Sequence, residues 1–302
     1  MKRGNEELSG RMIQSKKQKV FQTIILLILL VLALACLLPF WYILCQSFSS
    51  NEAIQAGKVK LLPVGFTMAS YQYVLKRLPF WKSFGVTMSR VLIGLPLSLF
   101  LLITAAYPLS RDSQKFKARN VYVWIFFLTM LFNGGMIPTY LLVNELHMLN
   151  TIWALVLPCA VNVFNMLLIL SFFRQIPDEL VDAAAIDGAN HWQTLWKIFV
   201  PISMPVLATV VLFTLVQHWN SWFDGMIYMK VDKYPLQTYL RSIIISFNFS
   251  NLSPEEQRRL AEFNQDGLKS AQMIIGVIPI LLVYPFLQKY FVSGITIGSV
   301  KG

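Results

Sequence analysis

The chain has 302 residues, of which 56% are hydrophobic and only 14% are charged. A soluble domain of this length carries about 25% charged residues, so the composition excludes an ordinary soluble protein. The hydrophobic residues are gathered into long runs, which predicts a polytopic membrane protein. We attribute the net charge of +11 to basic residues near span ends, which set topology, and not to a nucleic-acid surface.

The N-terminal segment, residues 1–19, holds six basic residues and two acidic ones. Such a basic leader is typical of the cytoplasmic side of a membrane protein. Residues 24–45 carry no charge and would extend about 33 Å as a helix, enough to cross a hydrocarbon layer of about 30 Å. We therefore place the first transmembrane helix at about residues 20–46.

A second span is predicted at about residues 83–109. Arg90 lies near its outer end, where the side chain could snorkel outward. Residues 111–119 follow with four basic residues and one acidic residue, which is a strong cytoplasmic mark.

The third span is expected at about residues 121–143 and contains Asn133-Gly134-Gly135 and Pro138. Glycine and proline interrupt regular helices, so the outer half of this span is predicted to be kinked or broken.

The fourth span is expected at about residues 151–173, with Asn162 and Asn165 three positions apart. Buried amides need partners, so we expect both to face the protein or a wet cavity and not lipid. The fifth and sixth spans are placed at about residues 200–222 and 270–290. The sequence thus predicts an all-α membrane protein of six spans, with a leader followed by one domain over residues 20–302 and with both termini in the cytoplasm.

Residues 177–199, between the fourth and fifth spans, are too polar for hydrocarbon. Pro177 suits the first turn of a helix, and Asp178 complements the positive end of that helix. Gly188 permits the positive φ that ends one helix before another begins, near His191. This pattern predicts a helix–glycine–helix elbow on the cytoplasmic side.

One face of the first elbow helix is expected to carry Leu180, Ala183, Ala184 and Asp187, which recur at spacings of three and four. Asp182 and Asp187 are not explained by the helix start. Two interpretations fit these residues: a docking surface for a soluble cytoplasmic partner, or a solvated amphipathic loop.

The elbow closely resembles the EAA loop of ABC-importer permeases. That loop reads Glu-Ala-Ala, three residues, Gly, nine residues, then Ile-x-Leu-Pro. The matching positions here are Asp182-Ala183-Ala184, Gly188 and Ile198-Phe199-Val200-Pro201. The spacing is met in full, because nine residues separate Gly188 from Ile198. Two positions differ from the family pattern: Asp182 stands in place of the Glu, and Val200 stands in place of the Leu.

Other segments are similar to the carbohydrate branch of that family, including maltose-type permeases. They are Ala106-Tyr107-Pro108-Leu109-Ser110-Arg111, Trp219-Asn220, Leu287-Gln288-Lys289-Tyr290-Phe291 and Val300-Lys301-Gly302. The run over residues 132–140 resembles permeases for complex oligosaccharides.

The resemblance implies the type I ABC-importer permease fold, with the first elbow helix as a coupling helix seated on a separate ATPase. The implied coupling residues are Asp182, Ala183, Ala184, Asp187, Gly188, Ile198 and Pro201. Implied partners are a second permease chain, two cytoplasmic ATPases that hold ATP and Mg²⁺, and an external substrate-binding protein. The chain would be a bacterial plasma-membrane transporter subunit and not an enzyme. It would bind no metal or cofactor and would move sugars, above all oligosaccharides, by alternating access.

Aromatic rings beside amides suit the hydroxyls and flat C–H faces of sugars. Trp219, Asn220 and Trp222 have that character, and Asn162 and Asn165 could line the same cavity. These five are the predicted substrate-pathway residues. The competing interpretation is that the tryptophans are interface anchors and the asparagines join helices.

Two other classes of membrane protein fit the sequence less well than a transporter subunit. A membrane-embedded enzyme needs carboxylates or paired histidines at membrane depth, and the predicted spans carry no acid. An ion-coupled carrier, for a sugar or another small solute, needs intramembrane ionisable residues and no elbow. The sequence contains no Gly-x-x-x-x-Gly-Lys-Ser/Thr phosphate loop, so any ATP would bind to another chain.

Overall fold

The computed structural model describes residues 16–112, 116–132, 134–245 and 265–298. Within these ranges every regular element is a helix, as predicted. The chain divides into two compact units, which are described separately. The first comprises residues 1–70 and 259–271, and the second comprises residues 71–258 and 272–302.

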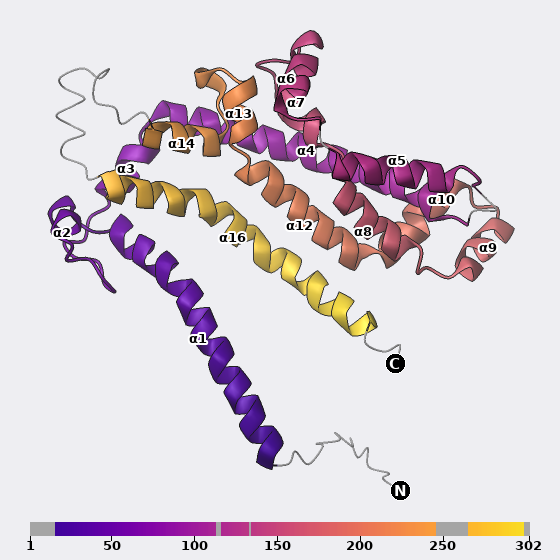
Figure 1. Cartoon of the computed structure of the whole chain (residues 1–302), viewed down its shortest axis with the longest axis horizontal. Coiled ribbons are helices and arrows are strands. Elements are labelled where there is room, and N and C mark those ends of the chain that lie inside the picture. Colours follow the sequence, from indigo (N-terminus) through magenta and orange to yellow (C-terminus); the bar gives the residue numbers. More distant parts are fainter. Residues whose placement is uncertain (1–15, 113–115, 133, 246–264, 299–302) are drawn as a thin grey trace, which may run out of the picture. The chain divides into compact units, whose positions relative to one another are not determined.

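The elements of the first half of the chain precede the elbow (Figure 1). They are α1 (Lys16–Ser47), α2 (Asn51–Gln55), α3 (Ala69–Leu75), α4 (Leu78–Ser110), α5 (Arg119–Leu131), α6 (Met136–Glu145), α7 (Ile152–Val156), the 3-10 turn η1 (Leu157–Cys159) and α8 (Val163–Phe173).

The remaining elements begin with the elbow. They are α9 (Asp178–Ile186), α10 (His191–Thr194), the π-helical turn η2 (Leu195–Phe199), α11 (Val200–Ile202), α12 (Met204–Asn220), α13 (Phe223–Tyr228), the 3-10 turn η3 (Val231–Lys233), α14 (Leu236–Ile245) and α16 (Gln265–Gly298).

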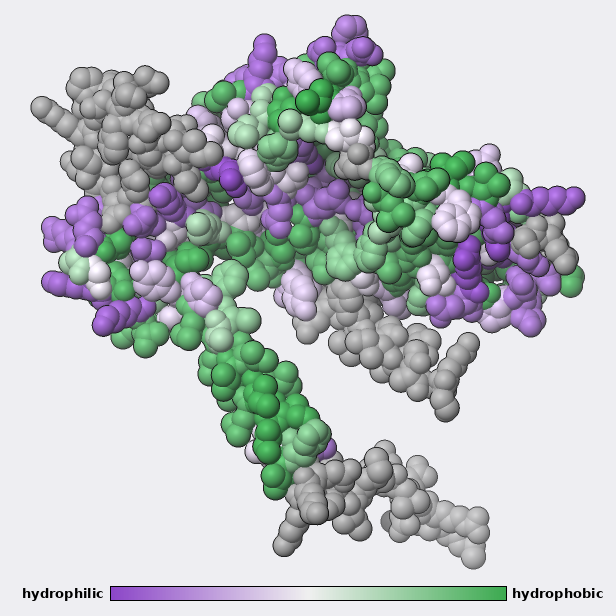
Figure 2. Space-filling model, in the orientation of Figure 1, coloured by the Kyte–Doolittle hydropathy of each residue, from purple (hydrophilic) through white to green (hydrophobic). Residues whose placement is uncertain are grey.

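In the first unit, α1 is apolar along its length, as Figure 2 shows. The most apolar window of its 28-residue stretch from Val20 to Ser47 is 0% buried inside the structure. A helix that is apolar and uncovered on all sides needs lipid or another chain around it. This agrees with the predicted first span at residues 20–46.

The C-terminal end of α1 is held by the segment that follows it. The Trp41 indole N–H donates to the Leu61 carbonyl at 2.8 Å, and the rings of Phe48 and Phe66 stack with centroids 5.5 Å apart. The Ser270 hydroxyl donates to the Gln46 side chain at 2.8 Å. The Trp41 and Phe48 contacts order the irregular loop after α1 against the helix end, and the Ser270 bond joins α16 to the same end.

In the second unit, α4 is the longest helix that lies wholly within the unit, and several others pack around it. Its 33 residues extend about 50 Å, well beyond the hydrocarbon thickness of about 30 Å. It packs mainly against α8 and α12, and it also contacts α5, α7 and α14. This single helix covers the predicted span at residues 83–109, begins five residues before it and is long and apolar enough to cross a membrane.

The apolar core of this unit lies where α4, α8 and α12 meet, towards the elbow. Its members are almost completely buried. They include Leu102, Ile103, Ala106, Met166, Ile169, Leu170, Phe173, Phe199, Leu207 and Val210. Since Phe199 belongs to the elbow segment, the second half of the elbow packs into the same core as the spans.

Three other predicted spans are broken helices. The axes of α5 and α6 differ by 112°, those of residues 152–159 and α8 by 48°, and those of residues 191–202 and α12 by 84°. The described helices thus provide three candidate spans, or six if each bent pair is one span. The predicted break in the third span is confirmed, but the breaks in the fourth and fifth spans were not expected.

The close approach of α4 and α12 depends on Gly94. A Cβ built on Gly94 would lie 2.7 Å from Cε1 and Nε2 of His218. We expect Gly94→Ala to lower the free energy of unfolding by about 1–3 kcal/mol, because the buried ring cannot yield without disturbing α12. Thermal unfolding of the purified protein in detergent measures this.

Gly85, on the same helix, provides the matched control, because a Cβ there would meet no atom within 4 Å. Gly85→Ala should raise stability slightly, since alanine is the better helix former by about 1 kcal/mol. Equal stability of the two variants would contradict the proposed close packing.

Candidate functional site

The first elbow helix, α9, begins as the sequence predicts and ends at a glycine. Pro177 occupies the N-cap, one position before its expected place in the first turn, and Asp178 and Glu179 follow in that turn. Gly188 has a φ of 77°. Its N–H donates to the Ala185 carbonyl at 3.1 Å, which keeps the chain tightly turned after the helix.

This helix end is a complete Schellman motif. Besides the Gly188 bond, the Ala189 N–H donates to the Ala184 carbonyl at 2.9 Å. The two bonds satisfy carbonyl groups that a helix C-terminus leaves unpaired, and the motif requires the left-handed conformation at Gly188. The prediction that Gly188 divides the elbow is confirmed.

The second elbow helix starts at His191, as predicted, behind a capping box. The Asn190 side chain accepts from the Gln193 N–H at 2.9 Å, and the Gln193 side chain accepts from the Asn190 N–H at 2.9 Å. The π-helical turn η2 then precedes Pro201. Because Pro201 has no backbone N–H, one helical hydrogen bond is missing here, and a wider π-helical turn accommodates such a gap.

Pro201 lies on the elbow side of the 84° bend, and the long part of the fifth span, α12, starts only at Met204. The expected start of that span near residue 200 therefore differs from the helix boundary. Ser203 occupies the bend and is 0% exposed. Ile198 is half-buried against the apolar core.

The predicted shared face of α9 is divided between core and surface. Ala184 is buried, whereas Leu180, Ala183 and Asp187 are exposed. The most exposed large apolar side chain of the elbow is Ile186, at 87%. Leu180, Ala183 and Ile186 recur every three residues, so they form an apolar exposed stripe on a polar elbow. The predicted coupling residue Asp182 is also exposed, beside this stripe.

The end of α4 holds the elbow in place through Arg111. Its guanidinium carbon lies 4.3 Å from the Phe199 ring centroid and 5.2 Å from that of Tyr107. A side-chain nitrogen of Arg111 lies 3.9 Å from a carboxylate oxygen of Asp178. The Tyr107 hydroxyl lies 3.4 Å from Nδ1 of His191. Both elbow helices are thereby tied to the same turn of α4.

Burial lowers the pKa of the Arg111 guanidinium, while Tyr107 and Asp178 act in the opposite direction. An arginine remains protonated under these conditions, so the group is a permanent cation between two rings. The Arg119 side chain donates to the Arg111 carbonyl at 2.8 Å, which holds the backbone at this position. The motif over residues 106–111 thus functions as the attachment of the elbow.

A second polar site lies at the opposite end of α12, around Arg90. This side chain is 1% exposed and forms an ion pair with Asp224. The Asp224 carboxylate also accepts from the Ser221 hydroxyl at 2.7 Å and from the Gly225 N–H at 2.8 Å. The prediction that Arg90 snorkels outward is wrong, because a carboxylate distant in sequence neutralises it inside the protein.

His218 and Cys159 complete this Arg90 cluster. Nε of Arg90 donates to Nδ1 of His218 at 3.3 Å, and the Cys159 sulfur lies 3.9 Å from Arg90 Nη2. An imidazole nitrogen that accepts a hydrogen bond carries no proton, so the proton of the neutral ring is on Nε2. No group of three metal-binding side chains occurs among the described residues, and the cluster is instead a joint between α4, η1, α12 and α13.

The predicted substrate-pathway residues at the end of α12 have different environments. Trp219 is buried, and its indole N–H donates to the Gly276 carbonyl at 2.8 Å. In this conformation the ring packs between helices and offers little surface to a sugar. Asn220 is exposed at the last position of α12, and Trp222 lines a pocket described below.

Asn162 and Asn165 lie at a helix break and not along one continuous helix. Asn162 is the N-cap of α8, and its side chain accepts from the Asn165 N–H at 3.1 Å. Asn165 is buried and donates to the Thr214 hydroxyl at 3.4 Å. Asn162 lines a cavity of about 480 Å³ between the breaks of two spans, together with Phe132 and Gly134.

The structure therefore places these five residues apart and not around one cavity. Asn162 and Trp222 line two cavities with no shared residue. Contact of any of the five with substrate stays a prediction.

Three features of the structure were not predicted from the sequence. The spacing of Leu180, Ala183 and Ile186 could have indicated the exposed stripe. The Arg90–Asp224 pair gives no local signal, because the two residues are 134 positions apart. Arg111 was noted as the last residue of the motif over residues 106–111, and its contacts with Phe199 and Asp178 are visible only in the structure.

The buried ion pair makes a quantitative prediction. We expect Arg90→Met to lower the free energy of unfolding by about 3 kcal/mol, because Asp224 loses its cation while staying partly buried. Adding Asp224→Asn should restore part of that loss. Lys82→Met is the control, because Lys82 lies exposed on the same helix. A loss no larger than that of the control, in denaturant titrations of the purified protein, would refute the pairing.

Comparisons with known proteins identify the family. The family described as binding-protein-dependent transport system inner membrane component matches residues 61–297. Protein LplC of Bacillus subtilis is 39% identical over 96% of this chain and 98% of that protein. The polygalacturonan/rhamnogalacturonan transport system permease protein YtcP of Bacillus subtilis is 37% identical over 95% of this chain and 100% of that protein.

A solved structure agrees with these relatives. The crystal structure of a bacterial ABC transporter involved in the import of the acidic polysaccharide alginate contains a chain 33% identical to this one. The TM-score is 0.83, over 92% of this chain and 99% of that chain. The predicted type I ABC-importer permease fold is thereby confirmed, as is the role of a transporter subunit rather than an enzyme. The chain belongs to the family of inner-membrane components of binding-protein-dependent ABC importers.

Proposed function

We propose that this chain is the permease subunit of an ATP-driven importer of oligosaccharides, in which α9 docks on a separate ATPase. Family membership and the substrates of two relatives, polygalacturonan or rhamnogalacturonan for one and alginate for the other, support the substrate class. The observation that carries the docking role is the exposed stripe on α9. Leu180 and Ile186 are 42% and 87% exposed on a segment that a glycine motif holds in one shape.

The proposed assembly needs four other components. They are a second permease chain, two ATPases that hold ATP and Mg²⁺, and a substrate-binding protein outside the membrane. With the elbow on the ATPase side, both termini of the chain lie in the cytoplasm of a bacterial cell, as the basic leader also favours. The Arg90 cluster then lies towards the outer surface.

The proposed mechanism is rigid-body alternating access. Closure of the ATPases displaces α9. The apolar stripe of α9 contacts the ATPase, and Asp182 and Asp187 add acidic contacts beside it. The displacement passes through Arg111 to α4 and through Phe199 to the core that α4 shares with α8 and α12. The small side chain of the exposed Ala183 permits the ATPase to approach α9 closely. The small side chain of the buried Ala184 permits α9 to pack closely on the core.

Substrate would pass the helix breaks, where unpaired backbone groups can bind sugar hydroxyls. The cavity beside Asn162 is lined by residues at the breaks of the third and fourth spans. Non-helical backbone at membrane depth is tolerated where it lines a wet cavity. Uptake of oligosaccharides by the reconstituted complex, dependent on ATP and on the binding protein, tests the function. ATP-independent uptake by this chain alone would favour an ion-coupled carrier.

The attachment of the elbow to α4 leads to one prediction. We expect Arg111→Gln to reduce ATP-driven uptake about tenfold while the ATPase still copurifies, because docking is retained and transmission is lost. The loss of the cation between Tyr107 and Phe199 corresponds to roughly 1–2 kcal/mol. Lys117→Gln, in the exposed part of the same loop, should leave uptake unchanged. Loss of copurification in Arg111→Gln would contradict the division between docking and transmission.

The glycine of the elbow leads to a second prediction. Gly188→Pro cannot adopt a φ of 77° and removes the N–H that donates to Ala185, so the Schellman motif is lost. The protein should still insert, but transport coupled to ATP hydrolysis should fall below about a tenth of its normal rate.

Gly188→Asn is the matched control, because asparagine tolerates the left-handed region and no atom lies within 4 Å of a Cβ there. It should retain most transport. Normal transport by Gly188→Pro, with membrane insertion verified, would show that the elbow does not couple the two reactions.

A further inference from the structure

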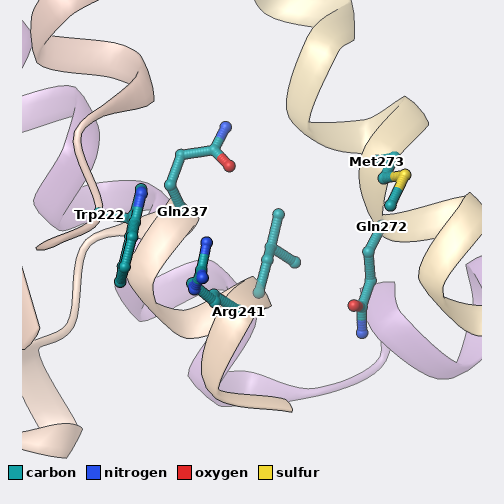
Figure 3. Close-up of a pocket in the computed structure, with 6 residues that line it drawn as sticks. Trp222, Gln237, Arg241, Gln272 and Met273 are labelled. Atoms are coloured by element: carbon teal, nitrogen blue, oxygen red, sulfur yellow. The ribbon is translucent and has the colours of Figure 1, made fainter. Parts of the chain in front are cut away.

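A small pocket lies at the end of α12 opposite the elbow, about 25 Å away along that 17-residue helix. Its volume is about 180 Å³. Figure 3 shows side chains from two sides of it, with Trp222 and Arg241 on one and the residues of α16 on the other. The lining consists of Trp222, Gln237, Leu240, Arg241, Gln272 and Met273.

Arg241 is the cation of this pocket, and among the described residues it packs on the Trp222 ring instead of pairing with a carboxylate. The guanidinium carbon of Arg241 lies 3.6 Å from the centroid of the Trp222 ring. Within the described ranges no carboxylate lies within ion-pair distance of Arg241, and its side chain is exposed. Stacking uses the flat face of the guanidinium and leaves the N–H groups of its edge able to donate.

Two amides accompany the cation. Gln237 is half-buried, and a Cβ on Gly276 would lie 3.2 Å from its Nε2. Gln272 is 1% exposed, and neither its Nε2 nor its Oε1 has a hydrogen-bond partner among the described residues. A buried amide without any partner is unfavourable, so this group indicates that a polar ligand or water completes the site.

The walls of the pocket are fixed before any ligand arrives. The Trp219 indole bond to the Gly276 carbonyl joins α12 to α16. The Thr238 hydroxyl donates to the Trp222 carbonyl at 2.7 Å and joins α14 to the end of α12. Preorganised groups lose little entropy on binding, which distinguishes a binding pocket from a flexible surface arginine.

We propose that this pocket binds an acidic sugar unit, a uronate, with Arg241 binding its carboxylate. The guanidinium edge matches a carboxylate in a bidentate geometry. Gln237 can bind ring hydroxyls, and Leu240 and Met273 give apolar surface to the C–H face. The volume equals that of about six waters, which is enough for one sugar ring and not for a longer chain. The assignment rests on the proposed function, because it names the substrate class of an oligosaccharide permease.

The test uses the complete transporter in nanodiscs of neutral lipid, without the binding protein, so that neither anionic headgroups nor a second sugar site contribute. The probes are trigalacturonate and its carboxyl-reduced, neutral counterpart, and binding is followed by calorimetry and by tryptophan fluorescence. We expect trigalacturonate to bind the wild type more tightly than the neutral sugar. Arg241→Gln should weaken trigalacturonate binding roughly 10- to 100-fold, the range expected for a hydrogen bond to a charged group.

Two matched variants make the result specific. Arg241→Lys keeps the charge but not the planar fork, so it should recover part of the affinity. Lys230→Gln removes an exposed cation outside the pocket and should change nothing. Added salt should weaken binding to the wild type and have little effect on Arg241→Gln, since only the former pairs two charges.

Other results would overturn the proposal. Equal binding of both sugars, or an equal loss of both in Arg241→Gln, would mean that Arg241 only supports the fold. Loss of the second permease from Arg241→Gln preparations, without a change in sugar preference, would make the pocket a subunit contact. Transport of neutral but not acidic oligosaccharides by the wild type would refute the uronate site alone. Transport of no carbohydrate at all would refute the proposed function together with it.

Discussion

The packing of α4 against α12 and α13 is built on one buried ion pair, Arg90 with Asp224. A guanidinium that is 1% exposed inside a helix bundle is tolerated only because a carboxylate and other polar groups surround it. The same guanidinium donates to His218, which fixes that ring against α4. The ring then leaves no room for a Cβ at Gly94. One buried charge thus constrains the residues at three other positions, Gly94 on α4, His218 on α12 and Asp224 on α13.

The elbow is built on the opposite principle, because its shape is set by local backbone chemistry. Gly188 ends α9 in the left-handed region, and the Asn190–Gln193 capping box starts α10 two residues later. Neither motif needs a distant partner. A segment that keeps its shape in this way can be displaced as a rigid body, which is what transmission of force requires. Arg111, at the end of α4, then supplies the connection: it packs on the Phe199 ring in the second half of the elbow and pairs with Asp178 at the start of α9.

This contrast explains what the sequence could predict. The elbow helices, the glycine between them and the broken third span were predicted because each is encoded within a few neighbouring residues. Arg90 was misread because an arginine near a span end looks the same whether it snorkels or is paired, and Asp224 is 134 residues away. Trp219 was predicted to line the substrate pathway from its aromatic character, whereas its bond to the Gly276 carbonyl is a tertiary contact that the sequence does not reveal. The separation of Asn162 from Trp222 likewise required the positions of the helix breaks.

The two ends of α12 differ in a way that constrains the motion. At the far end, His218 and Trp219 tie the helix to α4 and α16. At the elbow end the chain bends by 84° at Ser203, which lies between Pro201 and Pro205 and whose buried hydroxyl has no partner among the described residues. A helix cannot continue regularly through this sequence, so the bend is intrinsic. If α9 is displaced, α12 cannot move independently of α4, because the Arg90 cluster joins them. The relative motion must then be concentrated at the Ser203 bend and at the contact of Arg111 with the elbow.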